Sequence, residues 1–144
     1  MAIYGTPIVH PGREFERERW SNVFRPFYSA SAITGTSQLT VWDPAVGKKF
    51  VLKGFSITAV VRTTLAAANP KILGFFDNAT SAYVCDAGIS FFGTAPIGTW
   101  FTASRDLAEG IPSAAADNNL ILGVPGDLTT GVIEVMGCVW GEEI

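Results

Sequence analysis

The sequence predicts an all-β chain, an antiparallel β-sandwich of the jelly-roll type with an extended, irregular N-terminal arm. Short apolar runs of strand length recur about every ten residues from residue 38 onward, separated by Gly, Pro and Asn/Asp turn signals. The two Ala-rich runs, Leu65–Ala68 and Ser113–Ala116, lie beside prolines and are too short for stable helices. The first 31 residues show no regular hydrophobic period.

The length of 144 residues fits a single domain. We expect residues 1–31 to form the arm and residues 32–144 to form the sandwich domain. The arm contains three prolines and the alternating charge run Arg13–Arg19. Its large apolar side chains have no period of their own, so we expect them to lie on the rest of the domain or on a neighbouring subunit. These candidate contact residues are Ile3, Tyr4, Ile8, Phe15, Trp20, Phe24, Phe27 and Tyr28.

The first expected strand, Gln38–Trp42, is rich in Thr, Val and Trp and ends at the turn signal Asp43-Pro44. The second, Phe50–Arg62, has the clearest alternation in the chain. One face carries Phe55, Ile57, Ala59 and Val61, and the other carries Ser56, Thr58 and Arg62. Asn69-Pro70 is expected to break the chain before the short apolar run Lys71–Phe76.

The following strands are shorter. We expect them at Tyr83–Asp86, Ile89–Phe92 and Trp100–Ala103, separated by glycines and Pro96. Leu120–Val124 and Val132–Trp140 are close enough along the chain to pair as a hairpin. An immunoglobulin-like sandwich is the alternative fold. It is disfavoured because neither cysteine falls early enough to form the usual pair around a core tryptophan.

The last expected strand, Val132–Trp140, is largely apolar on both faces. Val132, Glu134, Met136, Cys138 and Trp140 share one face, and Ile133, Val135 and Val139 share the other. A sandwich strand of this kind needs a cover for its second face, either an arm or another subunit. Our candidate subunit-interface residues on this strand are Val135, Val139 and Trp140.

The composition also indicates assembly. Only 16% of residues are charged and 48% are hydrophobic, whereas an average soluble domain has about 25% charged residues. The charge is uneven, with a net +3 over residues 1–53 and −6 over residues 54–144. Such a distribution suits contacts between an arm and a neighbour, with chance as the alternative explanation.

Several function classes are disfavoured. The net charge of −3 argues against nucleic-acid binding. No apolar run approaches the length of a membrane-spanning helix. The N-terminus lacks a basic start followed by an apolar stretch, so we expect no signal peptide and synthesis in a cytoplasm. The expected partners therefore include neither nucleic acid nor a membrane.

The sequence predicts no catalytic, cofactor-binding or metal site. Its only histidine, His10, lies in the expected arm, and a catalytic site would need that residue to be held against a distant nucleophile. Most carboxylates stand at turns, and no pair has a spacing that marks a glycosidase. Cys85 and Cys138 lack metal-ligand spacing and are expected to be free, buried thiols, with a disulfide between them as the alternative. We therefore expect that the chain is not an enzyme and holds no cofactor.

Aromatic residues on strands allow two interpretations. Trp42, Phe91, Phe92 and Trp100 could line a platform for a carbohydrate, or they could fill the sandwich core. We favour the core, since large aromatic side chains in a domain of this size are needed to fill it.

Three stretches carry a resemblance to a known family. Lys53–Thr58, Asp117–Leu122 and the closing Gly131–Trp140 are similar to the strand pattern of small β-domains in phage particles. With the proline-broken arm and the missing catalytic set, the chain resembles the capsid decoration (cement) proteins of tailed bacteriophages. The resemblance implies a homotrimer that docks on the major capsid protein lattice, with its arm on neighbouring subunits. It also implies a place on the capsid exterior of the virion, after synthesis in the host cytoplasm.

Two alternatives stay open at this point. One is a phage tail-fibre or receptor-binding head domain, in which surface aromatics contact a glycan or a host protein. The other is a non-viral sandwich that binds carbohydrate or acts as an enzyme.

Overall fold

The computed structural model describes residues 23–33, 38–78, 82–124 and 130–144. All regular structure in these ranges is β-strand, and all strand pairs are antiparallel. The strands are β1 (Val23–Ile33), β2 (Gln38–Trp42), β3 (Phe50–Asp77), β4 (Tyr83–Ala95), β5 (Trp100–Pro112), β6 (Leu120–Gly123) and β7 (Thr130–Glu143). Within these ranges, no helix has the length and apolar character needed to cross a membrane.

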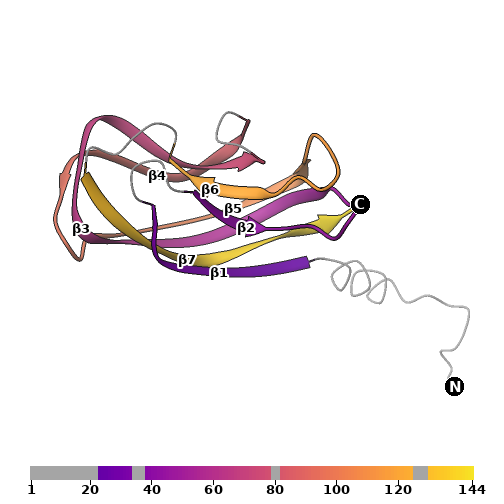
Figure 1. Ribbon diagram of the computed structural model, residues 1–144, viewed down its shortest axis with the longest axis horizontal. Coiled ribbons are helices and arrows are strands. Elements are labelled where there is room, and N and C mark those ends of the chain that lie inside the picture. The colour runs from indigo at the N-terminus through magenta and orange to yellow at the C-terminus, as the bar shows by residue number, and fades with distance from the viewer. Residues whose placement is uncertain (1–22, 34–37, 79–81, 125–129) are drawn as a thin grey trace, which may run out of the picture.

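The strands form two layers that share β3. The first part of β3 pairs with β7 and β5, and β7 pairs in turn with β1. The second part of β3 pairs with β4 and β6, and β6 pairs in turn with β2. The first layer therefore has the order β1-β7-β3-β5 and the second the order β2-β6-β3-β4, and the two stack face to face (Figure 1). The predicted antiparallel β-sandwich is confirmed.

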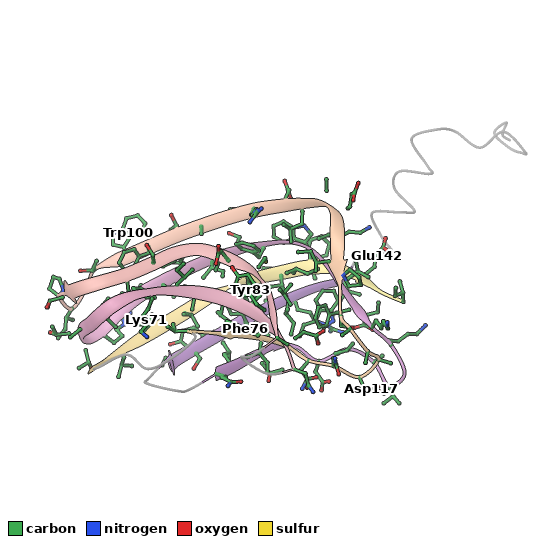
Figure 2. The ribbon with its side chains drawn as sticks, turned by 90° about the horizontal axis from the view of Figure 1, so that it is seen from above. Lys71, Phe76, Tyr83, Trp100, Asp117 and Glu142 are labelled. Atoms are coloured by element: carbon green, nitrogen blue, oxygen red, sulfur yellow. The ribbon has the colours of Figure 1, made fainter. Side chains whose placement is uncertain are left out.

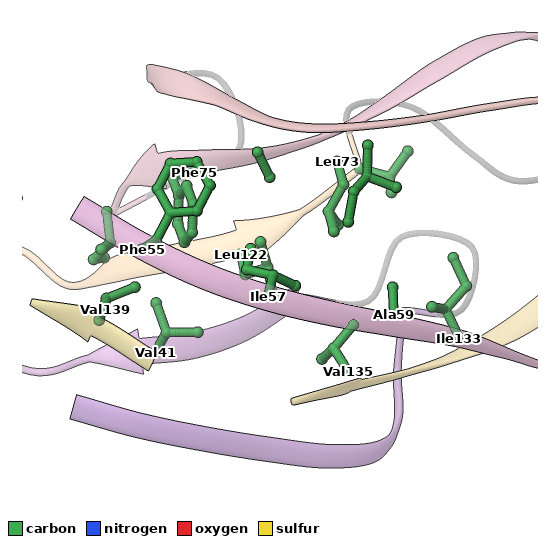
Figure 3. Packing of buried hydrophobic residues seen from close by; sticks show 14 of the residues in the cluster. Val41, Phe55, Ile57, Ala59, Leu73, Phe75, Leu122, Ile133, Val135 and Val139 are labelled. Carbon is green, nitrogen blue, oxygen red and sulfur yellow. The ribbon is translucent and has the colours of Figure 1, made fainter. Parts of the chain in front are cut away.

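The core lies between these layers. Its residues come from both parts of β3 and from the strands beside them, and they point toward one another (Figure 3). Phe55 and Phe75, from the two parts of β3, pack with ring centroids 4.8 Å apart and ring planes tilted by 50°. Phe91 on β4 meets Phe101 on β5 edge-on at 5.3 Å. These ring contacts fasten one layer to the other, and burial of such large apolar surfaces is the main stabilising term.

The predicted alternation of Phe50–Arg62 is confirmed. Phe55, Ile57, Ala59 and Val61 are at most 1% exposed, whereas Ser56 and Arg62 are exposed on the opposite face. The predicted break at Asn69-Pro70 is wrong, because β3 runs through it. The pairing register with β4 shifts between Ala67 and Lys71, so Pro70 falls within an irregularity of the ladder. Such a bulge tolerates a residue without a backbone N–H.

The predicted hairpin of Leu120–Val124 and Val132–Trp140 is also wrong. β6 pairs with β2 and the second part of β3, whereas β7 pairs with β1 and the first part of β3. The two strands therefore lie in different layers. Nearness along the chain does not decide pairing here, because each strand buries an apolar face against a different side of the core.

The predicted boundary between arm and domain, at residues 31 and 32, needs a correction. β1 spans Val23–Ile33 and is an integral strand of the first layer, paired with β7. Pro26 obscured this strand in the sequence. β1 pairs with β7 alone among the described strands, and a proline is tolerated on an edge strand whose N–H positions face away from the ladder. Residues 1–22 lie outside the described ranges.

Candidate interaction surface

The two faces of β7 have different surroundings. Val135 and Val139 are 0% exposed and belong to the main core. The prediction that they form a subunit interface is wrong, because side chains of the same chain already surround them completely. Trp140, the third predicted interface residue, is half-buried on the opposite face of the strand, where Met136 is 39% exposed.

The strand register places the outward residues of the first layer in rows. Phe24, Trp140 and Gly54 lie side by side on β1, β7 and β3, opposite Asp106 on β5. Two rows further along are Tyr28, Met136, Thr58 and Thr102. The next outward row pairs Glu134 with Val60 and Val60 with Trp100. We call the large apolar members of these rows the apolar face, which consists of Phe24, Tyr28, Val60, Trp100, Met136 and Trp140.

Much of the apolar face is open to solvent. Phe24, Tyr28 and Trp100 are 57%, 61% and 66% exposed. The prediction that Trp100 fills the core is wrong, whereas Trp42 and Phe91 do fill it, at 1% and 2% exposed. Trp100 lies at the opposite end of the molecule from Glu142 and Asp117 (Figure 2). Four of the nine large apolar side chains that are exposed in the described residues therefore lie on one side of one layer.

Trp140 is held in place on this face. Its indole lies over Gly54, where an added Cβ would come within 2.4 Å of the ring. The absence of a side chain at Gly54 is what lets the indole lie across β3. The Phe24 ring packs beside it, with centroids 6.4 Å apart.

A polar cluster joins three strands at the edge of the apolar face. The Tyr28 hydroxyl donates a hydrogen bond to Glu134 Oε2 at 2.9 Å. The Arg62 guanidinium donates to Glu134 Oε1 from Nε at 3.1 Å and from a terminal nitrogen at 2.5 Å. The hydrogen bond from Arg62, followed by that from Tyr28, holds the pKa of Glu134 below its ordinary value. The hydrogen bond to Glu134 raises the pKa of Tyr28. The cluster leaves this carboxylate ionised and its charge neutralised.

A second polar cluster fixes the C-terminal end of β7. The Trp42 indole donates to Glu143 Oε1 at 2.9 Å, and Arg25 donates to the same oxygen at 3.3 Å. The hydrogen bond from Trp42 is the main cause that lowers the pKa of Glu143. Lys53 pairs with Glu142 at 2.7 Å. These carboxylates bind strands together, which is a structural role.

A cavity of about 540 Å³ lies between β4 and β5, with one residue of β3 in its lining. It is lined by Phe55, Asp86, Ala87, Gly88, Thr102, Ala103, Ser104 and Arg105. Asp86 is the single carboxylate of this lining, and the Tyr83 hydroxyl donates a hydrogen bond to it. Burial raises the pKa of Tyr83 to about 12. A glycosidase site needs a second carboxylate across the cavity, and this lining does not supply one.

The two cysteines are free and lie on different sides of the sandwich. Cys85 on β4 is buried in the core, where burial raises its pKa to about 11. Cys138 on β7 is half-buried between Pro26 and Ser56 on the outer side of the first layer. In the described ranges, no group of three or more His, Cys, Asp and Glu side chains has the geometry to hold a metal ion.

The predicted arm residues divide into two groups. Phe24 and Tyr28 lie on the apolar face, and Phe27 packs against the core beside Gly137, which leaves room for its ring. The remaining predicted contacts and His10 lie outside the described residues; these contacts are Ile3, Tyr4, Ile8, Phe15 and Trp20.

The sequence did not single out Met136, Val60 or the cluster around Glu134. The alternation of β7 is a signal by which Met136 could have been found. Val60 could be assigned to the apolar face only from its register with Trp100 on β5.

No protein-family model matches this chain, and no curated protein matches it. Among solved structures, a chain of the cyanophage Pam1 capsid asymmetric unit is similar at 18% sequence identity. The match covers 83% of this chain and 82% of that chain, with a TM-score of 0.33. A likeness at this TM-score does not establish a shared fold.

Proposed function

We propose that this chain is a structural virion protein, a capsid decoration (cement) protein that binds the major capsid protein lattice and stabilises the shell. The observation that carries the proposal is the apolar face, a sheet surface with three large aromatic side chains more than half exposed on a well-packed sandwich. A surface of this kind marks a protein that works through contacts with other chains. The resemblance in strand pattern and composition indicates that the assembly in which these contacts are made is a capsid.

The strand pairing supports a jelly-roll connectivity within this proposal. Counted once in each layer, β3 gives two layers of four strands, with the orders β1-β7-β3-β5 and β2-β6-β3-β4. Two stacked four-stranded sheets joined by crossing connections are the form of a jelly roll. Many capsid-associated domains have this architecture.

The proposed role is structural and not enzymatic, without a cofactor. The best hydrogen-bonded carboxylates, Glu134 and Glu143, bind strands to one another, and the cavity between β4 and β5 carries one carboxylate. We further propose a homotrimer on the capsid exterior, with residues 1–22 as the arm that contacts neighbouring subunits. The net charge of −3 fits a partner other than nucleic acid.

Co-sedimentation with capsids assembled without this chain tests the proposal. The full chain should pellet with the capsids and raise the temperature at which the shells fall apart. A variant that lacks residues 1–22 retains every described strand, so it should fold and bind capsids at least tenfold more weakly. Failure of the full chain to bind capsids would refute the decoration role. Full occupancy by the shortened chain would refute the role of the arm.

A receptor-binding head domain is the second candidate, and one observation favours it. Trp100 is 66% exposed at one end of the molecule, where a sugar ring could stack on the indole. Trp42, the other tryptophan considered for this role, is buried and hydrogen-bonded to Glu143. Glycan-array binding that is lost in Trp100→Ala would favour this candidate over the capsid role.

A further inference from the structure

We infer that the apolar face is the surface through which this chain contacts a second copy of itself. The inference deepens the proposed function, since it assigns to a named surface the self-association proposed above. It rests on the size of the face, its charge and the way its aromatic side chains are held.

The size of the face suits a stable interface. Its strands have 11 residues in β1, 14 in β7 and 13 in β5. At about 3.4 Å per residue and about 4.8 Å between four strands, the whole outer side of the first layer, which contains the apolar face, covers roughly 700–900 Å². Each partner in a standard protein–protein interface buries about 800 Å². The first layer therefore offers enough area for one such contact.

The charge of the face permits a second copy as the occupant. Its two central rows contain no charged residue, since they are made of Pro26, Cys138, Ser56, Ser104, Tyr28, Met136, Thr58 and Thr102. In the row beyond, the Arg62 guanidinium neutralises Glu134. A neutral face meets a neutral part of its own copy without like-charge repulsion. A nucleic acid or an anionic membrane would find no cationic cluster here to bind.

The aromatic side chains of the face are held in place before any partner arrives. The Tyr28 hydroxyl is fixed by Glu134, and the Trp140 indole by Gly54 and Phe24. Tyrosine and tryptophan are the residues that most often dominate binding energy, and side chains already fixed lose little entropy on binding. Two copies can associate face to face, or the face of one copy can meet an edge of the next around a threefold axis. In either arrangement the aromatic residues of the apolar face become buried.

A matched pair of charge variants tests the inference. Met136 lies at the centre of the apolar face and is 39% exposed, and Ile72 lies on the outer side of the second layer and is 42% exposed. We expect native mass spectrometry and light scattering to show an oligomer for the full chain. Met136→Lys should weaken association at least tenfold, whereas Ile72→Lys should leave it unchanged. Circular dichroism and thermal melting verify that both variants fold.

The Cys138 thiol gives an independent readout in the unmodified full chain. It is half-buried in a central row, whereas Cys85 lies in the core and serves as an internal reference. Alkylation with iodoacetamide, read by mass spectrometry, should slow at least tenfold at Cys138 when the chain is concentrated enough to associate. If Met136→Lys does not fold, the rate of Cys138 alkylation still tests whether the apolar face is covered on self-association.

Three outcomes would overturn the inference: a monomer at all concentrations, an oligomer unaffected by Met136→Lys, or equal Cys138 alkylation in the dilute and concentrated chain. None of these measurements uses capsids. A chain that associates through this face and fails to bind capsids would refute only the proposed function. A chain that binds capsids as a monomer would refute only the inference.

Discussion

The outer sides of the two layers treat similar aromatic residues differently. In the first layer the Trp140 and Phe24 rings lie together with the indole over Gly54 of β3, and Phe24 stays 57% exposed. In the second layer Tyr83 and Phe76 lie over Gly74 of the same strand, with ring centroids 5.7 Å apart (Figure 2). Phe76 is only 1% exposed there.

The difference comes from what each layer has available to cover its rings. Phe76 pairs in register with Ile121, itself 7% exposed, and Tyr83 closes the other side, so the second layer covers Phe76 locally, whereas Ile72 and Tyr83 stay 42% and 54% exposed. The described part of the chain provides no such cover for Phe24 or Trp100. Within the described residues, the second layer therefore covers the large ring of Phe76, whereas the first leaves the rings of Phe24 and Trp100 exposed.

The largest expected effect separates two adjacent residues of β7. Val135→Asp would bury an uncompensated charge in the core and should destabilise the fold by more than about 4 kcal/mol. Met136→Asp changes the outward side of the same strand and, in a chain diluted until it is monomeric, should leave the free energy of unfolding within about 1 kcal/mol of the original. Urea denaturation followed by tryptophan fluorescence measures both. Similar losses in the two variants would contradict the assignment of the two faces.

An intermediate effect is expected where the second layer covers itself. Tyr83→Ala removes the ring that closes over Phe76 and the hydrogen bond to Asp86. The loss of an edge-on aromatic pair predicts destabilisation of about 1–2 kcal/mol. The exposed Phe76 should also increase binding of a hydrophobic dye. Unchanged stability and dye binding would show that Tyr83 is not the cover, and Tyr83→Phe, which keeps the ring, is the control.

The smallest expected effect is the pH dependence of the first layer. The pKa values of Glu134 and Glu143 lie below their ordinary values in the folded chain. A carboxylate with a lowered folded pKa contributes stability above its unfolded pKa of about 4.3, and that stability is lost as the pH falls through the folded pKa. The melting temperature should therefore decline from about pH 5 downward.

The variant Glu134→Gln should flatten part of this decline and lower the melting temperature by a few degrees at neutral pH. Glu109 is an exposed carboxylate on β5, and Glu109→Gln is the matched control that should follow the original profile. If the melting temperature of Glu134→Gln declines at low pH as steeply as that of the original chain, Glu134 does not contribute to the pH dependence of stability.

Short-range patterns in the sequence predicted much of the fold. The alternation in Phe50–Arg62 assigned the inward face of β3 correctly, and Gln38–Trp42 matches β2. Patterns that depend on a neighbour were predicted less well. Pro26 and Pro70 indicated breaks, yet an edge strand and a bulge accommodate them. A proline in a strand lacks only the hydrogen bond that a backbone N–H would donate at its position. The sequence does not tell whether a neighbouring strand accepts a hydrogen bond there.

The candidate site depended still more on tertiary structure. The two-faced pattern of β7 correctly indicated a surface in need of cover. The choice between its two sides required the position of the core, which places Val135 and Val139 inside and Met136 and Trp140 outside. Trp100 had the same residue type as Trp42 and a similar local context, but it lies on the outward side of β5.

By itself, the sequence determined the all-β class, the positions of most strands and the excess of apolar surface over charge. These are local or summed properties, because alternation and composition need no partner. Only the tertiary structure decided that β3 serves both layers, that β6 and β7 lie apart, and that Phe24, Tyr28, Trp100 and Met136 share one exposed face. Those facts depend on which strands pair and in which register, and a shift of one residue would exchange the two faces of a strand.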